Sequence, residues 1–150
     1  MPSVQQLQAY ADHINASTPL RYFHLKVSFP DAERVRVSLD DVQPQHRGGL
    51  GTLAINGGTL AAIFDLALGC TPALVDPTLR NATIQLSMSF ERPVTGNSVV
   101  AEAVIDSAGM TTLFASARIF DSKGIVCARC QGLVRLSKKG WESGVSPAVT

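Results

Sequence analysis

The sequence predicts an α+β fold in which an antiparallel sheet of five to six strands wraps around one long central helix. The first observation behind this prediction is the apolar run from Gly57 to Val75, which reads as a buried core helix. The second is the alternation of apolar and polar residues through residues 82–136, which is typical of strands. A helix that is apolar on all sides needs a covering layer, so the two observations together favour a sheet curved around it.

The chain is expected to form a single domain, because 150 residues suffice for one core and no internal repeat is evident. We expect this domain to span residues 1–136, with an N-terminal helix and linker in residues 1–20. Residues 137–150 show no period, so we expect a loosely ordered tail whose Trp141 docks on the surface.

The segment before the central helix predicts a short helix and a hairpin. Apolar residues within 4–14 follow the spacing of one helical face, and Pro19 limits that helix. Segments 22–29 and 34–39 are separated by a short turn and predict two paired strands. A glycine-rich loop, 43–53, then leads into the central helix, where it either closes over a ligand or simply connects two elements.

Four further strands are predicted after the break at Asp76-Pro77. They lie in residues 82–90, 99–105, 113–119 and 126–136. Every loop between them contains a glycine, which predicts three successive hairpins at residues 93–97, 107–110 and 121–124.

Composition and charge narrow the class of protein. Hydrophobic residues make up 45% of the chain and charged residues 17%, so we expect another subunit to cover part of the apolar surface. The net charge of +1 gives no sign of the strongly basic surface that would bind nucleic acid or an anionic membrane. The N-terminus lacks the pattern of a signal peptide. No uninterrupted apolar stretch reaches membrane-spanning length, because Asp65, Gly69 and Pro72 interrupt the run from Gly57 to Val75, so we expect a soluble, cytoplasmic protein.

The cysteines do not predict a metal site. Cys70, Cys127 and Cys130 are an odd, small number without a secretory signal, which favours reduced thiols. Cys127 and Cys130 have metal-like spacing, but residues three apart on a strand point to opposite faces. We therefore expect no metal.

Asp65 is the most informative residue, because it is the one charge within the apolar run. Burying an unpaired carboxylate costs several kcal/mol even after relaxation, so the chain pairs it, protonates it or uses it chemically. The run opens with Asn56-Gly57-Gly58, a turn that would leave free backbone N–H groups at the helix start. This neighbourhood favours a functional acid, although capping a nearby loop or pairing with an arginine stays open.

The order of these motifs resembles the hotdog-fold acyl-CoA thioesterases. The motifs are Asn56-Gly57-Gly58, the acid nine residues on, and Phe90-Glu91-Arg92-Pro93 followed by Gly96. The subfamily they most resemble is that of the phenylacetate-pathway (PaaI-like) thioesterases, over about residues 35 to 136. The family's usual histidine before Gly-Gly is Asn56 here. Asparagine can cap a helix, whereas it cannot transfer a proton.

The resemblance implies the hydrolysis of an acyl-CoA thioester to a free acid and CoA. Asp65 would act as general base or nucleophile, and the Gly57 backbone N–H would polarise the thioester carbonyl, with Asn56 and Gly58 beside the substrate. The resemblance further implies sites between subunits, with the glycine turn from one chain and Asp65 from its partner. The related enzymes carry a Ser or Thr that orients the attacking water at the position of Thr83. Strand phase puts Thr83 opposite the Leu86 face, so Thr83 reaches the site only if that face builds it or the strand start is irregular.

Two further residues are candidate substrate contacts. His46 lies in the glycine-rich loop, and Arg92 either holds the turn after its strand or meets a substrate phosphate. Other basic residues that would suit CoA phosphates, or simply solvate the surface, are Lys123, Arg129, Lys138 and Lys139.

The partner and cofactor expectations follow from the same resemblance. We expect a homodimer, with a dimer of dimers as an alternative, and no cofactor except the coenzyme A of the substrate. One rival function is a catalytically silent acyl-CoA or lipid-binding dimer. A hotdog hydratase or dehydratase ranks lower, because that chemistry uses a histidine closely after the acid and no histidine follows His46.

Overall fold

The computed structural model describes residues 1–140, so the predicted docking of Trp141 lies outside the described residues. The described residues form three α-helices, two 3-10 helices and six strands. In chain order the elements are α1 (Val4–Asn15), α2 (Thr18–Phe23), β1 (Lys26–Asp31), β2 (Arg34–Leu39), the 3-10 helix η1 (Pro44–His46), α3 (Gly57–Gly69), the 3-10 helix η2 (Thr71–Leu74), β3 (Leu79–Phe90), β4 (Val99–Ala108), β5 (Thr112–Phe120) and β6 (Val126–Gly140).

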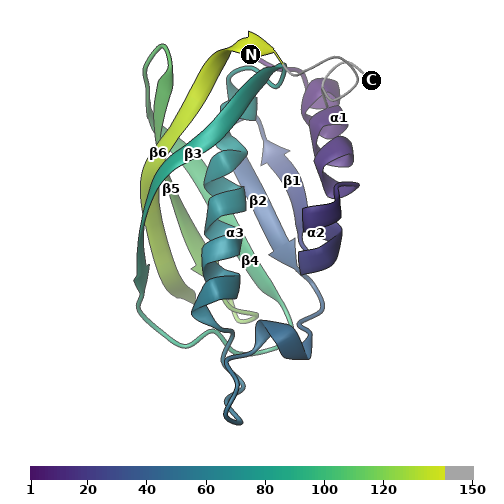
Figure 1. The fold of residues 1–150 in the computed structure, drawn as a ribbon, viewed down its shortest axis with the longest axis vertical. Coiled ribbons are helices and arrows are strands. Elements are labelled where there is room, and N and C mark those ends of the chain that lie inside the picture. The colour runs from purple at the N-terminus through teal and green to yellow at the C-terminus, as the bar shows by residue number, and fades with distance from the viewer. Residues whose placement is uncertain (141–150) are drawn as a thin grey trace.

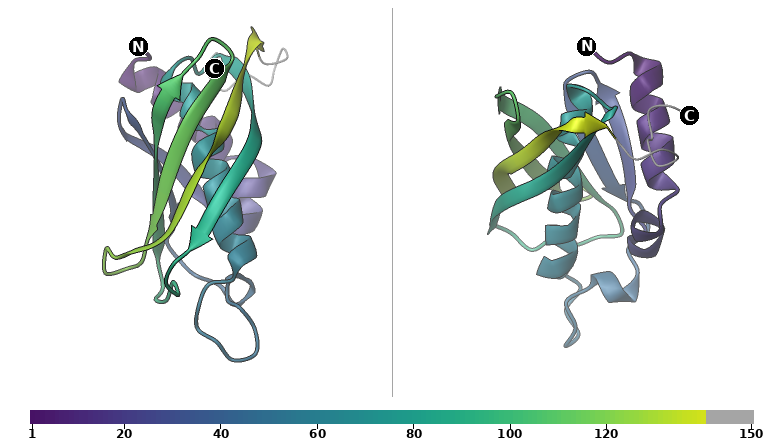
Figure 2. Two further views of the ribbon diagram at one scale, coloured as in Figure 1. Left: turned by 90° about the vertical axis from the view of Figure 1, so that its left-hand side faces the viewer. Right: turned by 45° about the horizontal axis from the view of Figure 1, so that its top comes forward.

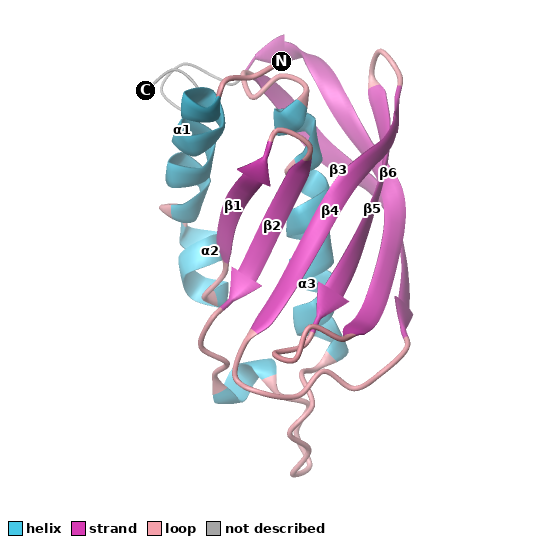
Figure 3. Ribbon diagram, turned by 180° about the vertical axis from the view of Figure 1, so that it is seen from behind, coloured by secondary structure: helices cyan, strands magenta, loops and turns pink. Residues whose placement is uncertain are grey.

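A single antiparallel sheet of six strands confirms the predicted fold class. Its order is β1-β2-β4-β5-β6-β3, and the sheet curves around α3, whereas α1 and α2 lie beside β1 (Figures 1 and 2). Seen from behind, the strands lie in front of α3, which shows that the helix packs on one face of the sheet and that no other helix of residues 1–140 covers the opposite face (Figure 3). The core between helix and sheet includes Val35, Val37, Phe64 and Leu68, all fully buried.

The strand β3 does not pair with β4, so the predicted hairpin at residues 93–97 is wrong. β3 pairs with β6 at the far edge of the sheet, and the chain then crosses to β4 beside β2. Val94 anchors this crossing because it is buried and its carbonyl accepts a hydrogen bond from the Ile55 N–H at 2.9 Å. The other two predicted hairpins, β4 to β5 and β5 to β6, are confirmed.

The N-terminal region differs from the prediction in one further respect. Pro19 does not merely limit the first helix, because it occupies the first turn of α2, where its missing N–H costs nothing. Tyr22 is therefore helical, and the strand predicted from that residue begins only at Lys26. His24 ends α2 in the left-handed conformation, with φ of 60°. At the other end of the chain, β6 runs on to Gly140.

The central helix is partly enclosed by the sheet. Residues 57–74 are long and apolar enough to span a membrane by composition, and 61% of that stretch is buried within the domain, as in the core helix of a soluble protein. The buried side of α3 carries Leu60, Ile63, Phe64, Ala67 and Leu68.

Candidate active site on the open side of the central helix

Asn56 caps the N-terminus of α3, as the sequence predicted. Its side-chain oxygen accepts from the Thr59 N–H at 2.7 Å. Its amide nitrogen donates to the carbonyls of Gln45 at 3.0 Å and Arg47 at 3.1 Å. Its backbone N–H donates to the carbonyl of His46 at 2.8 Å. Both amide hydrogens of Asn56 are therefore used to fix the preceding loop against the helix.

The backbone N–H groups of Gly57 and Gly58 follow this cap and belong to solvent-exposed residues. Neither N–H has an acceptor within residues 1–140. A side chain at Gly57 would meet the ring of Phe90 at 3.8 Å, so this ring borders the helix start. Because the helix dipole adds partial positive charge there, the position suits an oxygen that carries or develops negative charge.

Asp65 is exposed in the single chain, which corrects the expectation of a carboxylate buried in an apolar helix. The apolar run is enclosed on one side only. Small residues at Gly58, Ala62 and Gly69 share the other side with Asp65 and leave its carboxylate uncovered. Sequence periodicity could not reveal this, because those small residues read as apolar while exposing little side chain. In one chain Asp65 has no ion pair or side-chain hydrogen bond among the described residues.

Thr83 reaches the same side of α3 because β3 is irregular at its start. Thr83 pairs with Val134 and Gln85 pairs with Leu133, so Ile84 is an extra residue in β3. Such a bulge shifts the alternation of faces by one residue.

After this shift Thr83 shares the inward face with Leu86 and Met88, whose partners on β6 also point inward. The hydroxyl of Thr83 would lie 3.4 Å from a Cβ on Gly69, one helical turn beyond Asp65. It has no hydrogen-bond partner within the described chain. The predicted strand phase, which put Thr83 opposite the Leu86 face, is therefore wrong.

The two proposed halves of the site lie far apart within one chain. Gly57 and Asp65 are separated by eight residues of α3, which at 1.5 Å per residue is about 12 Å along the axis. A thioester carbonyl that contacts the Gly57 N–H cannot also contact the Asp65 carboxylate of the same chain.

His46 is buried beside the glycine-rich loop, and both of its ring nitrogens form hydrogen bonds to backbone groups. Its Nδ1 accepts from the Gln43 N–H at 2.9 Å, so Nε2 carries the proton and donates to the carbonyl of Phe23 at 3.0 Å. Burial lowers the pKa of His46, and its ring packs edge-on against His24. The geometry gives His46 a positioning role, because its own carbonyl holds Asn56.

Arg92 is exposed on the crossing connection two residues beyond Phe90. Its backbone N–H donates to the carbonyl of Cys127 at 2.9 Å, which holds the turn after β3. Within residues 1–140 its guanidinium forms no ion pair, so the side chain remains available at the end of β3 that borders Gly57.

Sequence reasoning did not include the apolar side chains of β3 among the site residues. Phe90, Ile84 and Met88 are exposed in the single chain, with exposed fractions of 53%, 55% and 37%. The alternating pattern of the sequence contains these apolar residues. That they are exposed follows only from the place of β3 at an edge of the sheet, which the pattern does not reveal.

Within residues 1–140 the thiols and acids form no second site. Burial raises the pKa of Cys70 to about 12 and that of Cys130 to about 11, and the nearby charge of Asp65 contributes in the same direction. Among the described residues no three His, Cys, Asp or Glu side chains are placed to hold a metal ion.

Comparison with known proteins connects this geometry to a family. Residues 54–128, half of the chain, match the family model of the thioesterase superfamily. No curated protein sequence matches the chain.

Solved structures share the fold at low sequence identity. The PaaI protein of the phenylacetic acid degradation operon of E. coli is similar with a TM-score of 0.77 and 16% identity, over 91% of this chain and 97% of that one. A thioesterase-related protein from Shewanella oneidensis has a TM-score of 0.77 and 15% identity, over 89% and 96% of the two chains. A thioesterase family protein from Silicibacter pomeroyi has a TM-score of 0.76 and 16% identity, over 87% and 97%.

The matched region begins just before the cap of α3 and ends within β6, so it contains Gly57, Asp65, Thr83 and Phe90. The match supports thioester hydrolysis as the general chemistry of the family. From the family match and the hotdog architecture of one helix within one curved sheet, the chain belongs to the thioesterase superfamily.

Proposed function

We propose that this chain is a cytoplasmic acyl-CoA thioesterase of the PaaI-like kind, which acts as a homodimer and needs no cofactor besides the CoA of its substrate. The observation that carries the proposal is the open side of α3. This side presents free N–H groups at one end and an uncovered carboxylate about 12 Å further along. The two groups have the chemistry of thioester hydrolysis but not the spacing of a site within one chain.

A second copy of the chain would bring a Gly57 N–H and an Asp65 carboxylate close together. β3 is an edge strand of twelve residues with unpaired backbone groups and exposed apolar side chains, and such edges are normally covered. If two copies pair about a twofold axis along this edge and α3, Gly57 of one copy approaches Asp65 of the other. A dimer of dimers is the alternative assembly.

The chemistry then proceeds in two steps for either role of Asp65. The Gly57 N–H donates to the thioester oxygen, and Gly58 allows the acyl group to approach the backbone closely. As a base, Asp65 takes a proton from water while the water oxygen attacks the carbonyl carbon. The C–S bond then breaks, and the CoA sulfur takes that proton from Asp65 and leaves as thiol. As a nucleophile, the carboxylate attacks the carbonyl carbon and displaces CoA as thiolate, which leaves an anhydride; water hydrolyses the anhydride to the free acid and the Asp65 carboxylate, and the proton released goes to the thiolate. Thr83 orients the water in both routes.

The remaining candidate residues have supporting roles in this proposal. Asn56 and His46 hold the loop and the helix start in place through the hydrogen bonds described above. Arg92 binds a phosphate of CoA near the end of β3.

The first experiment measures thiol release from a panel of acyl-CoA thioesters that differ in chain length and aryl group. Asp65→Asn should lower kcat by at least about 100-fold while leaving the assembly folded, since proton transfer or attack by the carboxylate is lost. Absence of activity in the wild-type chain across the panel would refute the enzyme proposal.

The second experiment tests whether two chains build one site. Gly57→Pro removes the N–H donor, yet proline suits the first helical position and the extended residue before it. Alone, Gly57→Pro and Asp65→Asn should both be inactive. Co-refolded in equal amounts, half of the dimers are mixed and each holds one intact site of two, so about a quarter of wild-type activity should return. No recovery would mean that each site lies within one chain.

One alternative function has an observation in its favour. The side chain of Asn56 is fully used as a cap and carries no imidazole, so a silent acyl-CoA or lipid-binding dimer would retain the same fold. Tight acyl-CoA binding without thiol release would support it. The hydratase alternative is less favoured, because the last histidine in the chain, His46, is buried with both ring nitrogens bonded.

A further inference from the structure

The outer face of the sheet, opposite α3, contains a cavity of about 450 Å³. This volume falls within the range of small-molecule sites in proteins. Its lining comes from five strands, and eight of its twelve residues are polar or charged. The side chains that matter here are Arg34, Glu102, Arg118, Arg129, Ser89 and Gln131.

Strand register explains why these side chains gather. Arg36 lies opposite Glu102, Glu102 opposite Arg118, Arg118 opposite Arg129, and Arg129 opposite Ser89. Because directly opposite residues share one face, these five form a single row across the sheet. Arg118 and Arg129 are therefore like charges on adjacent strands, an arrangement that is unfavourable unless an anion lies between them.

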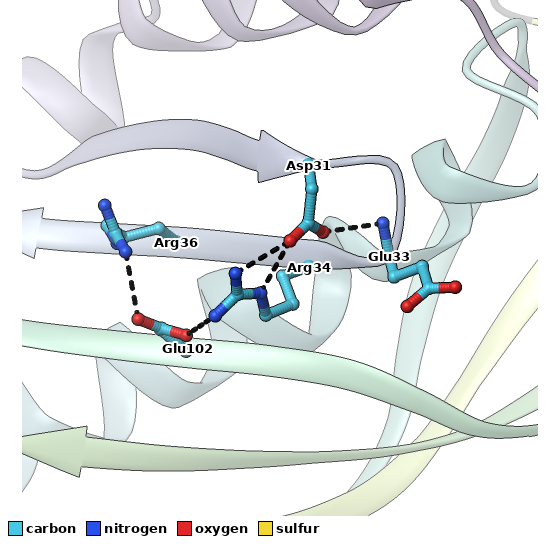
Figure 4. Close-up of polar contacts among 5 residues, drawn as sticks. All are labelled: Asp31, Glu33, Arg34, Arg36 and Glu102. Atoms are coloured by element: carbon cyan, nitrogen blue, oxygen red, sulfur yellow. Dashed lines mark hydrogen bonds and ion pairs between the residues drawn. The ribbon is translucent and has the colours of Figure 1, made fainter.

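The carboxylates of the face leave this pair largely uncompensated. Glu102 is occupied by Arg34 at 3.1 Å and Arg36 at 3.0 Å, one through each of its oxygens (Figure 4). Asp31 is likewise bound to Arg34, at 2.7 Å. Neither acid contacts Arg118.

Arg129 has one acidic partner, which is easily displaced. Glu91 lies 3.0 Å away, but the two side chains are 41% and 56% exposed, and such pairs are worth little in water. Within residues 1–140 Arg118 forms no ion pair, and its guanidinium stacks over Phe120 at 5.3 Å from the ring centroid. Stacking holds the charge in place and leaves its donors free.

Neutral donors complete the lining. The side chains of Ser87, Ser89 and Gln131 have no hydrogen-bond partner in the described chain. Ser116, on the neighbouring row, instead donates to Asp106 at 3.0 Å, which places one acid at the border of the cavity. The centre of the cavity therefore offers two guanidinium groups with free hydroxyl and amide donors around them.

We propose that this cavity binds a phosphate monoester, with its phosphate bridging Arg118 and Arg129 and its organic part in the remaining volume. Guanidinium groups bind phosphate oxygens in pairs, and the serines and Gln131 donate to the oxygens that remain. The site is on the face of the sheet opposite α3 and is independent of the proposed thioesterase site.

Isothermal titration calorimetry with adenosine 5′-monophosphate tests the proposal, and adenosine serves as the probe without phosphate. The wild-type chain should bind the monophosphate and not adenosine. Arg118→Gln and Arg129→Gln should each weaken binding at least about tenfold, because each removes a charged donor to the phosphate. Arg21→Gln, an exposed change on α2 away from the cavity, should leave the affinity unchanged.

Three results would overturn the proposal. The first is no binding of the monophosphate by the wild-type chain, and the second is equal binding of adenosine. The third is an oligomer that dissociates in light scattering on Arg118→Gln while the monophosphate does not bind, because this face would then be an interface between copies. Thiol release from acyl-CoA by Arg118→Gln should be unchanged without the monophosphate.

Discussion

The hydroxyl of Thr83 on β3 lies beside Gly69 on α3, 3.4 Å from where a Cβ would be. Gly69 follows Asp65 by one helical turn on the same side of the helix, so the hydroxyl and the carboxylate border one space. Only the absence of a side chain at Gly69 leaves this space open.

Replacing the Thr83 hydroxyl tests its role in catalysis. Thr83→Val keeps the shape of the side chain and should lower kcat roughly tenfold to a hundredfold, because the attacking water loses an orienting partner. KM and the free energy of unfolding should change little, since the hydroxyl makes no hydrogen bond within residues 1–140. Thr83→Ser is the matched control and should retain activity. Equal activity of Thr83→Val and wild type would assign Thr83 to packing alone.

Gly132→Ala should destabilise the fold more than any other glycine substitution on the sheet. A Cβ there would lie 2.2 Å from the Gln85 carbonyl oxygen and 2.9 Å from Leu68, so the bulged part of β3 must move. We expect a loss of about 3 kcal/mol in the free energy of unfolding, measured by urea denaturation. Gly57→Ala, whose Cβ would sit 3.8 Å from Phe90, is the control and should change stability by less than about 1 kcal/mol.

Removing the cap of α3 separates two contributions of Asn56. Asn56→Ala should cost about 2 kcal/mol, of which roughly half is the cap and half the hydrogen bonds to the loop carbonyls. Asn56→Ser keeps a capping oxygen without placing a carboxylate against the two carbonyls, and it should cost less in denaturation experiments. If both variants lose the same stability, the loop bonds account for the whole effect and the cap for none.

The stability of the protein should fall as the pH drops below about 6.5, because of His46. Burial holds the pKa of His46 below its ordinary value in the folded chain, while the unfolded chain binds a proton near pH 6.5. The unfolded state therefore binds more protons as the pH falls through this window, so the contribution is complete above it and is lost below it.

Urea denaturation at about pH 7.5 and pH 5.5 measures this dependence. His46→Gln should have a smaller difference between the two pH values than wild type. His13→Gln, an exposed change on α1, should keep the wild-type difference. A slope that survives in His46→Gln would assign the pH dependence to other groups.

Local patterns predicted much of the structure around the site. The cap, the glycine turn and the helix after Asn56 follow from side-chain chemistry within a few residues. The strands after Asp76 follow from alternation alone.

The rest depends on contacts that alternation does not encode. β3 lies beside β6 because of pairing between residues distant in sequence. The glycine-containing loop at 93–97 therefore did not indicate that the chain crosses from β3 to β4 at another position in the sheet. The extra residue Ile84 reverses the phase of Thr83, and no residue type marks it. Asp65 is uncovered because its neighbours on one side of α3 are small.

The crossing connection also sets the order in which the protein can assemble during synthesis. β3 is the third of the six described strands to be made, whereas its partner β6 is the sixth. Until Val126 and the residues after it have left the ribosome, the strand that carries Thr83 and Phe90 has nothing to pair with. A nascent chain with an unpaired, apolar strand is prone to wrong pairing with its neighbours, so this half of the site forms last and is the most exposed to misfolding.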